Sequence, residues 1–97
     1  MEESNNRSYY AIIPANVRYD KDLPPNAKLL YGEITALCNE KGYCWATNNY
    51  FASLYSVGKR SITGWISTLE KKGFISLEFI RENGNKEYSR RLIRIQG

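Results

Sequence analysis

The chain has 97 residues, of which 42% are hydrophobic and 13% aromatic, and its formal net charge is +4. This length suits a single domain, and this hydrophobic and aromatic content argues against a disordered tail. Residues 1–55 hold five Lys or Arg against six Asp or Glu, whereas residues 56–97 hold nine against four. The C-terminal part is therefore basic, which indicates either a surface for a polyanion such as nucleic acid or a solvated face.

The composition also restricts the chemistry. The chain has no histidine, and Cys38 and Cys44 are its only cysteines, which excludes most zinc sites and histidine-based nucleophile pairs. The acidic residues are scattered, and neither a P-loop nor a dinucleotide-binding glycine motif occurs. We therefore expect no enzyme, no catalytic residue, no metal and no cofactor.

The first residues are polar and acidic rather than a signal peptide, and no apolar run approaches the ~20 residues of a membrane span. We expect a cytoplasmic protein with reduced thiols that does not contact a membrane. Residues 1–8 are expected to be a flexible N-terminus, and residues 9–97 to be one domain.

The domain begins with an apolar run over residues 8–14, which predicts a short strand stopped by Pro14. Residues 14–23 are rich in charge and predict an irregular or single-turn connector. A first helix is predicted to begin at Pro24-Pro25, because proline is tolerated in the first helical turn, and to end at Gly42. Its apolar stripe is expected to hold Ala27, Leu30, Tyr31, Ile34, Leu37 and Cys38.

Two further helices are predicted after a brief extended segment at residues 43–45. Thr47 is the expected N-cap of a helix over residues 48–55. Residues 56–58 are too few for anything but a tight turn. The third helix is predicted over residues 59–72, with Gly73 as its C-terminal stop.

A β-hairpin is predicted at the C-terminal end. Residues 74–80 alternate in part between apolar and polar, residues 86–95 form the partner strand, and an Asn-Gly dipeptide at residues 83–84 lies in the turn. The apolar faces are expected to hold Ile75, Leu77, Phe79, Ile93 and Ile95. The predicted order of elements is helix, short strand, helix, tight turn, helix and hairpin. This is the order of a winged helix-turn-helix, an α+β fold with a three-helix core and a hairpin wing.

A helix-turn-helix unit packs two short helices steeply across a tight turn, which requires a small residue at the crossing. Ala52 is the candidate for this position. The inward-facing residues are expected to be Phe51, Tyr55, Val57, Ile62, Trp65 and Ile66. The outward face of the third helix then combines basic and small polar residues around a glycine, a composition that permits close approach to base edges and phosphates. This face holds Lys59, Arg60, Thr63, Gly64 and Ser67.

Residues 9–95 also resemble the winged-helix domain at the N-terminus of replication initiator proteins of Gram-positive phages and plasmids. The likeness is carried by the stretches YYAIIPANVRYDKDLPPNAKLLYGEITAL, NEKGYCWATNNYFASLY and SITGWISTLEKKGFI. One difference lies in the turn, where Ser56 occupies a position that is often glycine and Gly58 follows two residues later. The resemblance implies DNA replication initiation, double-stranded DNA as the partner, and replication proteins bound through C-terminal segments typical of this family. A homodimer is a further alternative for the partner, since many helix-turn-helix proteins bind as dimers to two DNA half-sites.

For the helices, the resemblance implies that residues 59–72 lie in the major groove with Lys59, Arg60, Thr63 and Ser67 facing the bases. For Lys59 and Arg60 the alternative is a solvated helix start, although positive charge at this end of a helix opposes the helix dipole. At the start of the preceding helix, Asn48 and Asn49 are candidates either for a phosphate contact or for simple capping.

For the wing, residues 81–91 are expected to contact the DNA backbone. The candidate residues are Arg81, Lys86, Tyr88, Arg90 and Arg91. Alternatively, Glu82 and Glu87 pair with the arginines across the strands.

Two other functions fit the same fold. One is a transcriptional regulator, which the sequence separates poorly from an initiator. The other is a winged helix used for protein–protein assembly, in which the apolar run with Tyr9, Tyr10, Ile12 and Ile13 is an oligomerisation edge.

Overall fold

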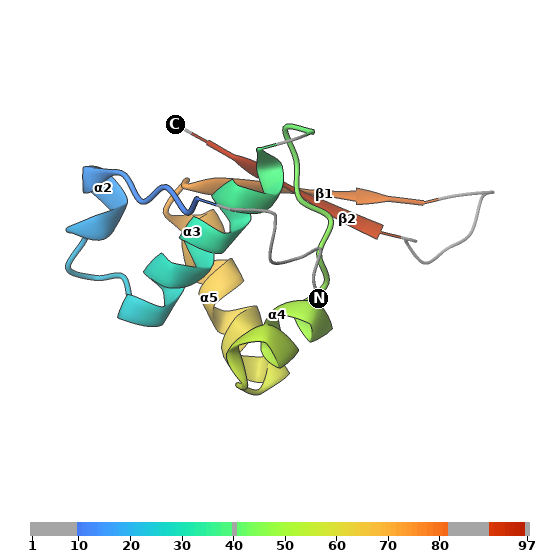
Figure 1. Cartoon of the computed structure of the whole chain (residues 1–97), viewed down its shortest axis with the longest axis horizontal. Coiled ribbons are helices and arrows are strands. Elements are labelled where there is room, and N and C mark those ends of the chain that lie inside the picture. Colours follow the sequence, from blue (N-terminus) through green and yellow to red (C-terminus); the bar gives the residue numbers. More distant parts are fainter. Residues whose placement is uncertain (1–9, 40, 82–89, 97) are drawn as a thin grey trace.

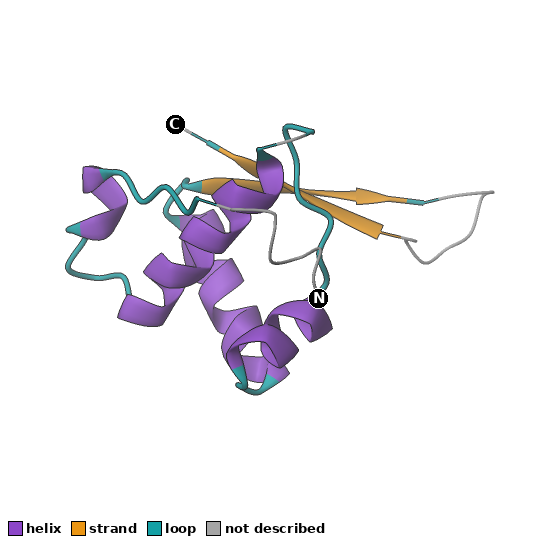
Figure 2. Ribbon diagram, viewed as in Figure 1, coloured by secondary structure: helices purple, strands orange, loops and turns teal. Residues whose placement is uncertain are grey.

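The computed structural model of the chain describes residues 10–39, 41–81 and 90–96. Its elements are α2 (Ala15–Arg18), α3 (Pro25–Cys38), α4 (Asn48–Tyr55), α5 (Lys59–Lys71), β1 (Ile75–Ile80) and β2 (Arg90–Ile95). The two strands form one antiparallel sheet, the helices lie on one side of it, and the paired strands extend past the helices at one end (Figure 1). Figure 2 shows the same separation of helices and strands. The predicted winged helix-turn-helix fold is confirmed.

Local signals in the sequence explain where most helices begin and end. Pro24 and Pro25 stand at the start of α3, and the Thr47 hydroxyl accepts a hydrogen bond from the Tyr50 N–H at 3.1 Å as the N-cap of α4. The predicted end of the first helix was wrong. The α3 helix stops at Cys38, and Gly42 lies in the following turn, where its φ is 82° and its N–H donates to the Cys38 carbonyl at 2.7 Å.

The core lies where α3 and α5 pack on the sheet and α4 packs on α5. Its buried residues come from every element from α2 onward and are almost all aliphatic or aromatic. They are Val17, Leu23, Ala27, Leu30, Tyr31, Ile34, Cys44, Phe51, Ile62, Ile66, Leu69, Ile75 and Ile93. Burying this apolar surface is the main favourable term in folding.

The predicted strand over residues 8–14 was wrong for the part that the structure describes, because residues 10–13 form no strand. They run across α3 instead. A Cβ built on Gly32 would lie 3.0 Å from the Ala11 Cβ, and the Thr35 hydroxyl accepts a hydrogen bond from the Ile12 N–H at 2.9 Å. The missing side chain at Gly32 therefore lets this segment pack closely on the helix, and the predicted single-turn connector follows as α2.

The sheet pairs Ile75 with Ile95 and Leu77 with Ile93, as the predicted apolar faces require. Cys44 adds a bridge to β2, because its N–H and carbonyl both bond to Ile93, at 2.8 and 2.7 Å. Phe79, near the end of β1, shares this face but is 48% exposed.

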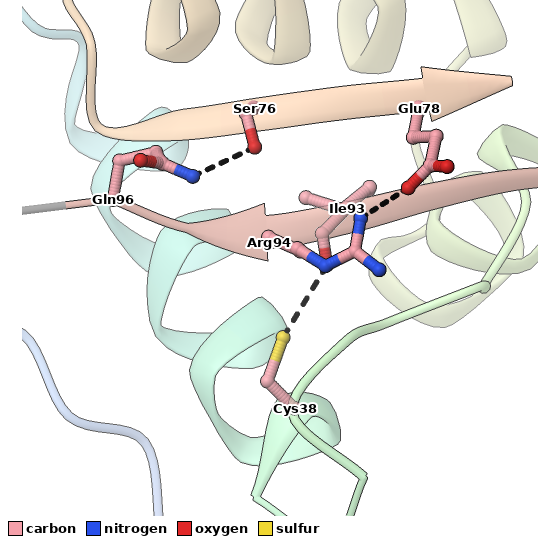
Figure 3. A network of polar contacts seen from close by, with 6 residues as sticks. All are labelled: Cys38, Ser76, Glu78, Ile93, Arg94 and Gln96. Atoms are coloured by element: carbon pink, nitrogen blue, oxygen red, sulfur yellow. Dashed lines mark hydrogen bonds and ion pairs between the residues drawn. The ribbon is translucent and has the colours of Figure 1, made fainter.

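Polar side chains link the two strands on the opposite face. Gln96 donates to the Ser76 hydroxyl at 2.8 Å, and Arg94 pairs with Glu78 (Figure 3). A separate contact joins the sheet to α3, where the Cys38 thiol donates a hydrogen bond to the backbone carbonyl of Ile93 at 3.6 Å (Figure 3). Leu92 is buried although it alternates with Ile93, which the period-2 pattern did not predict.

Candidate nucleic-acid interface

The turn between α4 and α5 has the geometry of a Schellman motif. Ser56 is left-handed, with φ 57° and ψ 47°. Its N–H donates to the Ser53 carbonyl at 3.4 Å, and the Val57 N–H donates to the Ala52 carbonyl at 3.0 Å. Most L-residues disfavour this conformation, and glycine usually occupies it. Ser56 therefore does take the place of the turn glycine.

The residues predicted to face inward pack across this turn. Phe51 and Ile62 are completely buried, Ile66 is nearly so, and Ala52 and Val57 are half-buried against the same core. Trp65 and Tyr55 also pack there. The helical pair is thus held by apolar contacts, which leaves the opposite face of α5 outside the core.

That outward face is open and basic at its N-terminal end. Lys59, Arg60, Thr63 and Gly64 are exposed, and Ser67 is half-buried. The first turn of α5 contains no acidic residue, so its two cations add to the positive end of the helix dipole. A Cβ on Gly64 would meet nothing within 4 Å, so no neighbour in the described structure requires glycine there.

A helix pair of this geometry, joined by a three-residue turn, corresponds to a known family. Residues 21–75, more than half of the chain, match the family described as a helix-turn-helix domain. The chain belongs to the helix-turn-helix domain family. Its membership indicates DNA binding, and the matched region runs from the connector before α3 to the first residue of β1.

The comparison with curated proteins found no match, and neither did the comparison with solved structures. Within the described ranges, no helix combines the length and the apolar character that crossing a bilayer requires.

The helix-turn-helix brings together two of the predicted DNA-binding residues that are far apart in the sequence. Asn48, in the first turn of α4, donates through Nδ2 to the Thr63 hydroxyl of α5 at 3.2 Å. The Thr63 hydroxyl in turn donates to the Lys59 carbonyl at 3.0 Å. Asn48 is not the cap of α4, because Thr47 is; Asn49 is exposed beside it.

Two arginines of the predicted wing make contacts inside the domain. The Arg90 guanidinium lies 4.8 Å from the centre of the Trp45 ring, and Lys41 lies 5.3 Å from the same ring. The neighbouring Arg91 donates to the Ala46 carbonyl at 2.8 Å. Both arginines thus connect β2 to the segment before α4, and their contact with DNA stays a prediction.

Of the three remaining wing candidates, one lies within the residues that the structure describes and two do not. Arg81 is exposed directly after β1. Lys86 and Tyr88 lie outside the described residues, as do Glu82, Glu87 and the predicted Asn-Gly turn. Within the described strands, the cross-strand ion pair is the one between Glu78 and Arg94.

Three titratable side chains, those of Tyr55, Cys38 and Cys44, pack in or against the core. The Tyr55 hydroxyl donates to the Glu33 carboxylate at 3.1 Å and ties α4 to α3. Burial, together with that carboxylate, raises the pKa of Tyr55. Burial likewise raises the pKa of Cys38, to about 11, and that of Cys44. Cys38 packs against the core, as its place on the predicted apolar stripe of the first helix indicated.

Proposed function

We propose that this domain binds double-stranded DNA in a sequence-specific manner, as the DNA-binding part of a phage or plasmid replication initiator. In this proposal α5 lies in the major groove, with Lys59, Arg60, Thr63 and Ser67 toward the bases. The N-terminus of α4, with Asn48 and Asn49, lies near a phosphate, and the wing contacts the backbone. The initiator role rests on the resemblance of residues 9–95, and a transcriptional regulator of the same fold is the alternative.

The observation that carries the proposal is the outward face of α5. It is exposed, positively charged in its first turn and free of packing against the described core, whereas the opposite face of the same helix is buried. A recognition helix has this arrangement, because its N-terminal residues reach base edges while its other side holds the unit together.

Selection of bound sequences from a random duplex pool tests the proposal directly. Enrichment of direct repeats is expected for an origin-like array, and a palindrome indicates a dimer on an operator. A pool that shows no enrichment contradicts sequence specificity. The affinity for the selected site is also expected to fall linearly with the logarithm of the salt concentration, with a slope of about −0.9 per phosphate neutralised.

A charge-matched pair of variants tests the assignment of α5. We expect Lys59→Ala/Arg60→Ala to bind the selected duplex about tenfold to a hundredfold more weakly, because a base contact is worth about 1–3 kcal/mol. Arg18→Ala/Lys21→Ala removes one arginine and one lysine from exposed positions in α2 and the connector after it, outside α5, and is the control. Equal losses in the two variants would show that net charge, not α5, accounts for binding.

Gly64 offers a second test that separates folding from binding. Gly64→Ala is expected to stabilise the domain by about 1 kcal/mol, because glycine is a poor helix former and the added methyl meets no neighbour. The same methyl is expected to weaken DNA binding, since it holds the α5 backbone away from the groove. A variant that is more stable and binds equally well would place the DNA elsewhere.

One observation favours the assembly function as a second candidate. Tyr10 is 72% exposed and Ile12 is 60% exposed, in the segment that crosses α3. Sedimentation of the protein at several concentrations, with Tyr10→Ser/Ile12→Ser as the comparison, tests this function. A concentration-dependent oligomer that the variant loses, together with no shift of any duplex at low salt, would replace the DNA-binding proposal.

A further inference from the structure

The hydroxyl of Thr63 is already occupied within the protein. It donates its proton to the Lys59 carbonyl, one helical turn earlier, at 3.0 Å. It also accepts a hydrogen bond from Asn48 Nδ2 at 3.2 Å. A hydroxyl has a single proton to donate. Thr63, although exposed on the outward face of α5, therefore has no proton left for a base acceptor.

Stability alone does not account for Asn48 at this position. Its Oδ1 is buried and has no hydrogen-bond partner among the described residues, which is unfavourable for folding. Its Nδ2, however, reaches Thr63 from the neighbouring helix. Threonine in a helix divides between two side-chain rotamers, and the Lys59 carbonyl and the Asn48 donor together hold Thr63 in the one that places its hydroxyl between them. Asn48 thus contributes to fixing which part of Thr63 faces outward.

We propose that Thr63 presents its methyl group to the major groove and recognises the C5 methyl of a thymine, with Asn48 as the residue that positions it. This inference rests on the proposed function, because it requires α5 to lie in the groove. Thymine is the base that fits, since it carries the methyl group in the major groove, where the other bases present polar edges or hydrogen.

Replacement of thymine by deoxyuridine, which lacks only the C5 methyl, tests the proposal. Each thymine of the selected duplex is replaced in turn, and the affinity of the full chain is measured by fluorescence anisotropy. At one position we expect about fourfold weaker binding, the ratio that corresponds to ~0.8 kcal/mol for one buried methyl group. No loss at any position, or a selected site without thymine opposite α5, would overturn the inference.

Two substitutions assign the effect to Thr63. Thr63→Ser keeps the hydroxyl and removes the methyl, so it is expected to bind the thymine and deoxyuridine duplexes equally well. Asn48→Ala/Thr63→Val keeps the methyl and removes both polar partners together, which avoids leaving the Asn48 amide unpaired. This double variant is expected to retain a preference for thymine. Retention of the preference by Thr63→Ser would show that another residue reads the methyl.

The positioning role of Asn48 has its own readout. Asn48→Ala is expected to reduce the ratio of thymine to deoxyuridine affinity, because only the bond to the Lys59 carbonyl then holds the Thr63 rotamer. A purely structural role would lower the melting temperature and leave that ratio unchanged, which would overturn the positioning role. Failure to bind any duplex would instead contradict the proposed function itself, so the two failures are distinguishable.

Discussion

Ser56, in the turn between α4 and α5, is the position at which we expect a single substitution to stabilise the domain. Its φ of 57° and ψ of 47° lie in the left-handed region, which costs an L-residue about 1–2 kcal/mol. Glycine removes this cost but loses about 0.5–1 kcal/mol through its greater freedom in the unfolded chain. Ser56→Gly is therefore expected to gain about 0.5–1 kcal/mol, or roughly 2–8 °C in melting temperature. The end of α5 supports this, because the equivalent left-handed position there is Gly73, with φ 82°.

The measurement is thermal and urea unfolding of Ser56→Gly beside a matched control. Ser53→Gly places glycine at an exposed position inside α4, where it is expected to destabilise the domain by about 0.5 kcal/mol. The two substitutions are chemically identical and differ only in backbone conformation. If both destabilise the domain equally, the left-handed conformation of Ser56 carries no energetic cost and the reasoning is refuted.

Three other predictions concern the core, the thiols and the connector. Phe51→Ala is expected to destabilise the domain by about 3–5 kcal/mol in urea unfolding, because Phe51 is completely buried; a loss below 1 kcal/mol would contradict its central place. With the Cys38 pKa raised to about 11 and that of Cys44 also raised, both thiols should react slowly with Ellman's reagent at pH 8 and quickly after unfolding. The Asp22 N–H, together with Lys72, lowers the pKa of Asp20 below 3.8, so its stabilising contribution is present above that pH and lost as the pH falls through the lower folded value. Acid unfolding of Asp20→Asn should lack this component, and an unchanged pH profile would disprove it.

The limits of α4 and α5 could be predicted from the sequence because the signals that set them are local. Thr47 caps α4 through a bond to the third residue after it, and Gly73 supplies the left-handed conformation that ends α5. The apolar spacing on α5 likewise identifies the face that is buried, since that spacing follows the helical repeat. Knowing the buried face was enough to predict the outward face of α5.

Contacts between elements were not predictable in this way. The bond from Asn48 to Thr63 joins residues 15 positions apart, and the bond from Arg91 to Ala46 joins residues 45 apart. No periodicity relates such pairs, because each depends on the angle at which two packed elements meet. The path of residues 10–13 across Gly32 is of the same kind, since an apolar run contacts whichever surface the rest of the fold provides.

The sequence by itself thus determined the order of the elements from α3 onward and the basic outward face of α5, since propensity, capping and periodicity act over a few residues. Only the tertiary structure decided what each candidate side chain is able to do. In the structure the Thr63 hydroxyl is hydrogen-bonded to the Lys59 carbonyl, and the Arg90 guanidinium lies over the Trp45 ring. Hydrogen bonds and ring contacts depend on distances of a few ångströms between elements, and packing of the whole core sets those distances.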